Sequence, residues 1–127
     1  MPFKSYSRVG TEAVPVSVAT VFGGVGEQPQ IRALRAGTDI VIATPGRLLD
    51  LMSRGYANFT GLQFLVLDEA DRMLDMGFLP DIKRIIALLP PARQNLLFSA
   101  TFPDEIRRLT KSLLNNPAEV QVAARNA

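Results

Sequence analysis

Apolar residues in this 127-residue chain fall into short continuous runs separated by amphipathic stretches. The runs are rich in β-branched and aromatic side chains, and they predict strands at residues 16–22, 39–43, 64–67, 95–99 and 119–122. Strands that alternate with helical patterns indicate βαβ units and a parallel sheet. Because the runs are continuously apolar, we expect helices on both faces of that sheet, which is an α/β fold in three layers.

The stretches between the runs carry helix signals. Apolar residues at helical spacing follow Pro80, at Ile82, Ile85, Ile86 and Leu89, and a Pro-Pro pair ends the run. Pro103 is expected in the first turn of a further helix, and shorter helices are expected at residues 28–35 and 46–54. Residues 3–8 resemble the end of a helix.

Acidic residues follow the run at 64–67 directly, as Asp68, Glu69 and Asp71. Ligand sites of open parallel sheets lie at the carboxyl ends of strands, so these three carboxylates are placed for a cation or an activated water. Asp68 can hold Mg²⁺, directly or through water, and Glu69 can orient and deprotonate a water for attack on a γ-phosphate. The alternative is a solvated turn whose acidic residues begin a helix.

Two hydroxyls end the next predicted strand, at Ser99 and Thr101. They are expected within reach of Asp71, and hydroxyl-to-carboxylate bonds there would link the two strand ends. The alternative is a strand end made of small residues that caps the helix at Pro103.

Two loops suit a phosphate backbone. One follows the strand at 39–43 and offers a hydroxyl, backbone N–H groups and a guanidinium; the other follows the strand at 16–22 and lets a ligand approach closely because its residues lack side chains. Their residues are Thr44, Pro45, Gly46 and Arg47, and Gly23 and Gly24. The alternatives are an ordinary helix start and an ordinary turn.

Composition narrows the chemistry. The chain has no Cys and no His, which excludes thiol nucleophiles, histidine bases, Ser-His-Asp triads and the usual zinc sites. Its net charge of +2 supports nucleic-acid binding only weakly. The apolar runs are too short to cross a bilayer and the amino terminus does not resemble a signal peptide, so we expect one cytoplasmic domain and no membrane partner.

Four motifs, in order, resemble those of the DEAD-box ATP-dependent RNA helicases. They are VFGG at 21–24, ATPGR at 43–47, VLDEADR at 66–72 and FSAT at 98–101. The resemblance runs from about residue 3 to the end and is closest to the bacterial RhlE-type branch. It implies that residues 1–127 are the later part of the first of two RecA-like, P-loop NTPase domains.

The resemblance also implies an activity, cofactors and a partner. Such helicases use ATP and Mg²⁺ to clamp RNA and locally separate short duplexes. Asp68 would then serve Mg²⁺, and Glu69 the attacking water. The residues that couple hydrolysis to strand separation would be Asp71, Ser99 and Thr101, and those that contact the RNA backbone Gly24, Thr44 and Arg47.

Several parts of that family's pattern do not occur in the 127 residues. They are the Gln motif, the phosphate loop Ala-x-x-Gly-x-Gly-Lys-Thr, the Pro-Thr-Arg-Glu-Leu-Ala segment and the second helicase domain. We therefore expect the isolated chain to be inactive on ATP and to need the missing helicase halves. We also expect its strands either to pair across the gaps or to expose apolar edges, with marginal stability.

Two other interpretations stay open. The chain could be a non-catalytic module that binds RNA or a protein partner through its two loops. A different P-loop ATPase is disfavoured, because DEAD at 68–71 and SAT at 99–101 occur together.

Overall fold

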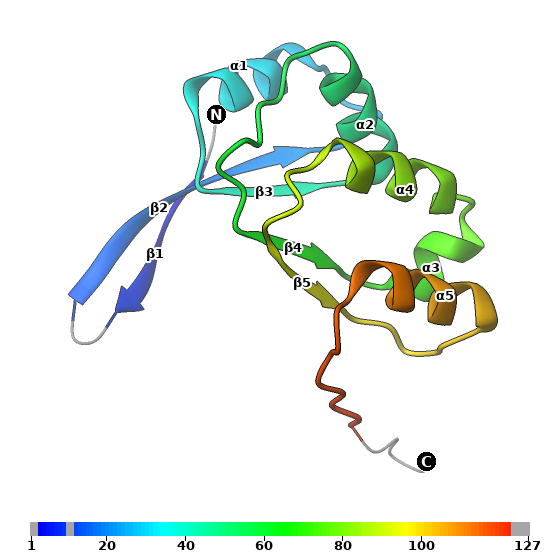
Figure 1. The fold of residues 1–127 in the computed structure, drawn as a ribbon. Helices are drawn as coiled ribbons and strands as arrows, with labels where there is room; N and C mark the ends of the chain where they lie inside the picture. Colours follow the sequence, from blue (N-terminus) through cyan, green and yellow to red (C-terminus); the bar gives the residue numbers. More distant parts are fainter. Residues whose placement is uncertain (1–2, 10–11, 123–127) are drawn as a thin grey trace, which may run out of the picture.

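The computed structural model describes residues 3–9 and 12–122, and the surroundings of side chains from residue 15 onward (Figure 1). In chain order the elements are β1 (Phe3–Val9), β2 (Glu12–Val21), α1 (Gln28–Ala36), β3 (Ile40–Ala43), α2 (Pro45–Ser53), β4 (Phe64–Leu67), α3 (Ala70–Asp75), α4 (Leu79–Leu88), β5 (Gln94–Leu97) and α5 (Asp104–Leu113). The predicted α/β class is confirmed.

The strands form two sheets. The first has the order β1-β2-β3, in which β1 is antiparallel to β2, and β2 is parallel to β3 from Val18↔Ile40 to Val21↔Ala43. The second is the parallel pair β4-β5, in register from Phe64↔Gln94 to Leu67↔Leu97. The parallel pairing agrees with the prediction. The strands were expected either to pair across the gaps left by absent strands or to expose edges, and they divide into two sheets. Within the described residues, β3 and β4 do not pair, so the strands expose edges.

Two predictions about the ends of the chain were wrong. Residues 3–9 form a strand instead of the end of a helix, because they pair with β2 and satisfy an edge that would otherwise be open. Residues 119–122 are not a strand, and Val120 and Val122 are 88% and 91% exposed. A short β-branched run needs a neighbouring strand to bond with, and the described residues offer it none.

The helices agree with the prediction to within a few residues, which is the usual uncertainty of helix ends. Pro103 is the N-cap of α5 with extended backbone, one position before the first turn in which it was expected. The short helix α3, directly after the acidic residues, was not predicted.

Each sheet has its own hydrophobic core. Val21, Ile31 and Leu51 form the core of the first sheet, under α1 and α2. The core of the second sheet is made of Leu67, Ile82, Leu109 and Leu113. Helix α2 packs against α4, so helices connect the two halves where strands do not.

The helices were expected on both faces of the sheet, in three layers, but among the residues that the structure describes they cover one side of the strands (Figure 1). Figure 1 shows α1, α2 and α4 on the same side of β2, β3, β4 and β5. Side chains alternate accordingly: Ile40 and Ile42 of β3 are 47% and 51% exposed, and Phe64 and Val66 of β4 are 57% and 53% exposed. The opposite side of these strands is therefore a bare apolar face.

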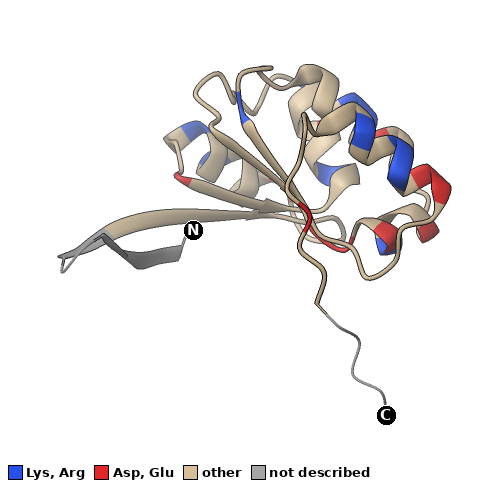
Figure 2. Ribbon diagram, turned by 60° about the horizontal axis from the view of Figure 1, so that its bottom comes forward, with Lys and Arg blue, Asp and Glu red and all other residues tan. Residues whose placement is uncertain are grey.

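The helices and the strands of the two sheets also differ in charge. Figure 2 shows Lys and Arg on the helices, whereas β3, β4 and β5 contain no charged residue. Within residues 3–9 and 12–122, no helix is both long enough and apolar enough to cross a membrane.

Candidate functional site

The four sequence motifs all lie at the carboxyl ends of strands. The residues after β4 and β5, namely Asp68, Glu69, Asp71, Ser99 and Thr101, form what we call the β4–β5 site. The residues after β2 and β3, namely Gly23, Gly24, Thr44, Pro45, Gly46 and Arg47, form the β2–β3 site. Parallel pairing places the two loops of each site at one edge of their sheet.

Asp71 is the centre of the β4–β5 site. Its Oδ2 accepts hydrogen bonds from the Thr101 hydroxyl at 2.9 Å and from the Thr101 backbone N–H at 3.0 Å. The Ser99 hydroxyl accepts the Asp71 backbone N–H at 3.1 Å and donates to the Thr101 carbonyl at 2.6 Å. The expected proximity of Asp71, Ser99 and Thr101 is confirmed, although Ser99 bonds the backbone of Asp71 and not its carboxylate.

These bonds favour the charged form of the Asp71 carboxylate. The Thr101 hydroxyl is the largest influence that lowers the pKa of Asp71 below its ordinary value, and partial desolvation opposes it. The Ser99 side chain and the backbone N–H groups of Thr101 and Arg72 add to the lowering. Asp71 is therefore ionised at neutral pH and connects the two strand ends.

Backbone bonds hold the same corner. The Phe98 N–H donates to the Leu67 carbonyl at 2.8 Å, and the Ala70 N–H donates to the Phe98 carbonyl at 3.0 Å. Between them, Glu69 has φ 53° and ψ 48°, the left-handed region that residues other than glycine seldom adopt. Such strain collects at functional sites.

The other two carboxylates are exposed, and within the described residues Asp68 accepts one hydrogen bond, from the N–H of Glu69 at 2.9 Å. No group of three or more acidic side chains in the described part of the chain could hold a metal ion. The expected convergence of three carboxylates was thus wrong, because Asp71 is directed to Thr101. The exposed Asp68 still fits Mg²⁺ as a single protein ligand, since Mg²⁺ is commonly bound by one or two carboxylates together with substrate phosphates and waters.

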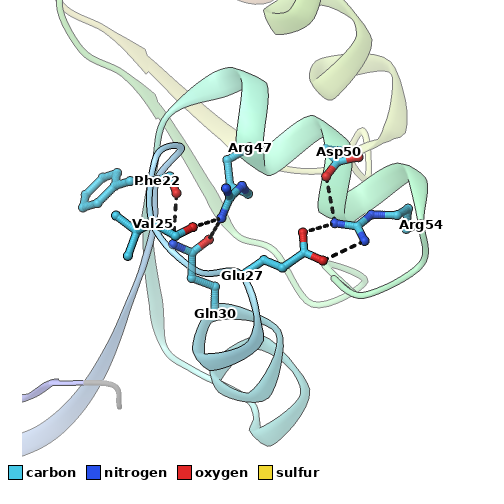
Figure 3. Close-up of polar contacts among 7 residues, drawn as sticks. All are labelled: Phe22, Val25, Glu27, Gln30, Arg47, Asp50 and Arg54. Carbon is cyan, nitrogen blue, oxygen red and sulfur yellow. Dashed lines mark hydrogen bonds and ion pairs between the residues drawn. The ribbon is translucent and has the colours of Figure 1, made fainter.

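Arg47 joins the two loops of the β2–β3 site. Its Nη1 donates to the Val25 carbonyl and to the Gln30 side-chain oxygen, both at 2.9 Å (Figure 3). Gln30 Nε2 in turn donates to the Phe22 carbonyl at 3.0 Å. The sequence reasoning missed Gln30, although a polar residue on the side of α1 that also presents Ile31 and Ala33 to the core was a signal.

The rest of this site suits close approach by a ligand. Thr44 is the extended N-cap of α2 and makes no side-chain bond to that helix, and Pro45 follows in the first turn. A side chain at Gly46 would meet the Phe78 ring at 3.9 Å. Gly24 has φ 78° with open space around it, and a residue with a side chain would be strained there.

An exposed ion-pair group lies beside this site. Arg54 of α2 pairs with Glu27, which precedes α1, and with Asp50 one turn earlier (Figure 3). The hydrogen bond from Arg54 is the main cause that lowers the pKa of Glu27. This group is a second link between α1 and α2, at the surface.

Comparison with known proteins bears on this geometry. Residues 3–109 match the model of the DEAD/DEAH box helicase family. This chain belongs to that family. It is 48% identical over 122 residues to DEAD-box ATP-dependent RNA helicase 30 of Oryza sativa, covering 96% of this chain and 17% of the rice protein. It is also 48% identical over 109 residues to ATP-dependent RNA helicase DeaD of Haemophilus influenzae, covering 86% of this chain and 18% of that protein.

Two solved structures share the fold. A DEAD box protein from Methanococcus jannaschii matches with a TM-score of 0.74 at 42% identity, covering 78% of this chain and 27% of that one. A hypothetical ATP-dependent RNA helicase from Sulfolobus tokodaii matches with a TM-score of 0.74 at 46% identity, covering 80% of this chain and 30% of that one. The RecA-like, DEAD-box prediction is confirmed, and the chain spans less than a third of each of these four proteins. The assignment to the RhlE-type branch stays a prediction.

Proposed function

We propose that residues 1–127 act as the later part of the first RecA-like domain of an ATP-dependent RNA helicase. In this role the chain supplies the carboxylates for ATP hydrolysis and one set of RNA contacts. The observation that carries the proposal is the Asp71–Thr101 pair, because it joins two family motifs that lie 30 residues apart in the sequence. A cytoplasmic location stays a prediction with it.

The hydrolytic chemistry belongs to the two exposed carboxylates. Asp68 would hold Mg²⁺, most simply through a water, and Mg²⁺ when bound would offset the charge of the phosphates. Glu69 would orient the attacking water and accept its proton. The hydrogen bond from the Glu69 backbone N–H to Asp68 Oδ1 fixes the Asp68 carboxylate against the backbone of Glu69.

Asp71, Ser99 and Thr101 would transmit the state of the nucleotide. Asp71 lies in the first turn of α3, just after Asp68 and Glu69, while Ser99 and Thr101 lie in the loop that leads to α5. A shift of the Asp68–Glu69 backbone would thus pull on the β5–α5 loop through the bonds to Asp71. This is a coupling by direct contact, which a change at either end can break.

The β2–β3 site would hold the RNA. The Thr44 hydroxyl, the open backbone at Gly24 and the guanidinium of Arg47 are suited to phosphate and sugar oxygens. Contacts of this kind do not read base edges, so the binding is independent of sequence.

The isolated chain should bind ATP only weakly. A charge-assisted hydrogen bond contributes about 1.5 to 3 kcal/mol, whereas micromolar affinity totals about 8 kcal/mol. A phosphate loop makes several such bonds, and the 127 residues contain no sequence with its spacing. Its loss therefore removes most of the binding.

Two measurements test the proposal. When ATP and Mg²⁺ are titrated into the chain by calorimetry, we expect no saturable binding at micromolar concentration. When the missing parts of the two helicase domains are supplied, RNA-stimulated ATP hydrolysis should appear, and Glu69→Gln should abolish it while RNA still binds. Hydrolysis that survives Glu69→Gln would refute the assigned role.

A non-catalytic RNA-binding module is the second candidate, favoured by the proximity of the two loops of the β2–β3 site. With two or three phosphate contacts its affinity should be low, and each contact should contribute about 0.7 log units of salt dependence. If RNA binding were unaffected by ATP even in the completed protein, this candidate would replace the first.

A further inference from the structure

Gln30 is the buried polar residue of the described core, with 7% of its surface exposed. It lies in the first turn of α1, behind the loop that carries Gly23 and Gly24. Both ends of its amide are used: Nε2 donates to the Phe22 carbonyl and Oε1 accepts from Arg47 Nη1. A carbonyl oxygen only accepts and a guanidinium only donates, so this arrangement fixes which end of the amide faces which partner.

The bonds close a ring around the loop. Arg47 Nη1 reaches the Val25 carbonyl as well as Gln30, so the loop is gripped at Phe22 and again at Val25 (Figure 3). Between those two points are Gly23 and Gly24, around which added side chains would find open space. Among the described residues, the polar ring is the contact that holds this open part of the loop.

The same ring orients Arg47. Its described hydrogen bonds all come from Nη1. Since a guanidinium is a rigid plane with five N–H donors, fixing one nitrogen at two acceptors fixes the direction of the other donors. Losing Gln30 would leave the plane tied at Val25 alone and free to rotate.

We propose that Gln30 is a positioning residue for RNA binding, which holds the Gly23-Gly24 loop and the Arg47 guanidinium in one arrangement so that both reach the same phosphate backbone. The inference rests on the proposed function of the β2–β3 site. Gln30 itself is buried and does not touch the RNA.

The test measures binding of a fluorescein-labelled oligouridylate to the 127-residue chain by anisotropy, at low ionic strength where phosphate contacts are strongest. Gln30→Met keeps the length of the side chain and removes both hydrogen bonds. We expect it to weaken binding about tenfold, the effect of one charge-assisted hydrogen bond. The matched control is Gln28→Met, the same change at an exposed position of α1, which should leave affinity unchanged.

Two further readouts separate positioning from general damage. Because Gln30 acts partly through Arg47, the double variant Gln30→Met with Arg47→Ala should lose less affinity than the sum of the two single losses. Gln30→Met should also make the slope of log affinity against log salt concentration shallower by about 0.7, the contribution of one phosphate contact. If circular dichroism shows that Gln30→Met does not fold, Gln30→Glu takes its place. This variant keeps an acceptor for Arg47, so it should bind RNA more tightly than Arg47→Ala does.

The outcomes distinguish the two proposals. Wild-type affinity in Gln30→Met, together with weak binding in Arg47→Ala, overturns the positioning role alone. Additive losses in the double variant overturn it as well. Wild-type affinity in Arg47→Ala and Thr44→Ala would overturn the proposed RNA contacts themselves.

Discussion

The β4–β5 site and the β2–β3 site solve one problem in different ways. Each must join two loops at the ends of neighbouring strands while leaving groups exposed for a ligand. The first uses an ionised acid, Asp71, against the hydroxyl and N–H of the next loop. The second uses a cation, Arg47, against a carbonyl and a buried amide. At the first site the joining side chain, Asp71, is distinct from the exposed carboxylates that would serve the ligand, whereas at the second site Arg47 both joins the loops and would contact the ligand.

The sites also differ in where the joining residue comes from. At the β4–β5 site, the partners follow directly from strands whose ends are paired at Leu67↔Leu97, so the sheet brings them together. At the β2–β3 site, the ring needs a residue from inside α1. The first site therefore depends on strand register, and the second on how a helix seats on its sheet.

The largest effects on stability should come from truncations in the two cores. They also test whether the two sites are independent of each other. Leu51→Ala and Leu109→Ala remove side chains that are 0% and 3% exposed, and such truncations cost about 2 to 5 kcal/mol. Urea unfolding should show the loss in each variant. Backbone amides should then exchange faster with solvent at the β2–β3 site in Leu51→Ala and at the β4–β5 site in Leu109→Ala. Equally faster exchange at both sites in each variant would contradict separate cores.

Acid should weaken the β4–β5 site through Asp71. The pKa of Asp71 is lowered in the folded chain, so its contribution to stability is present above the unfolded value of about 3.9 and is lost as pH falls through the lower folded value. Asp71→Asn should remove that contribution and flatten the acid limb of the stability curve. Thermal melts from neutral to acidic pH measure this, and an unchanged acid limb would show that Asp71 does not carry it.

A smaller effect is expected from Thr101→Val, which keeps the shape of the side chain and removes its hydroxyl. Because that hydroxyl is the main cause of the lowered pKa, the pKa of Asp71 should move up towards its ordinary value. Titration of the Asp71 carboxyl by NMR measures the shift, with Thr110→Val on α5 as the control. An unmoved titration would assign the lowering to the Ser99 side chain and the backbone N–H groups.

The smallest effect belongs to the surface link beside the β2–β3 site. Arg54→Ala removes the pairs with Glu27 and Asp50, and exposed ion pairs contribute little. We expect a melting temperature close to that of the unaltered chain, with RNA affinity preserved. A loss of affinity as large as that of Gln30→Met would show that the surface link, and not the buried amide, seats α1.

What the sequence predicted follows the same contrast. The strand ends that meet through register, Asp71 with Ser99 and Thr101, were predictable because motif residues after parallel strands share an edge. Gln30 was not predicted, because a lone glutamine in an amphipathic helix carries no motif, and its partners are the Phe22 carbonyl and the Arg47 guanidinium from other elements. The amino-terminal strand was missed as well, since its pairing with β2 depends on an edge that local sequence does not reveal.

The left-handed backbone at Glu69 places folding and chemistry in opposition. A glycine there would relax a conformation that costs on the order of 1 to 3 kcal/mol in other residues, at the loss of the carboxylate. Laboratory evolution of this chain for heat resistance alone should therefore replace Glu69 by glycine. Selection for ATP turnover in the completed helicase should restore Glu69. The two selections applied in turn would make this single codon a reporter of whether the domain is being kept for its shape or for its reaction.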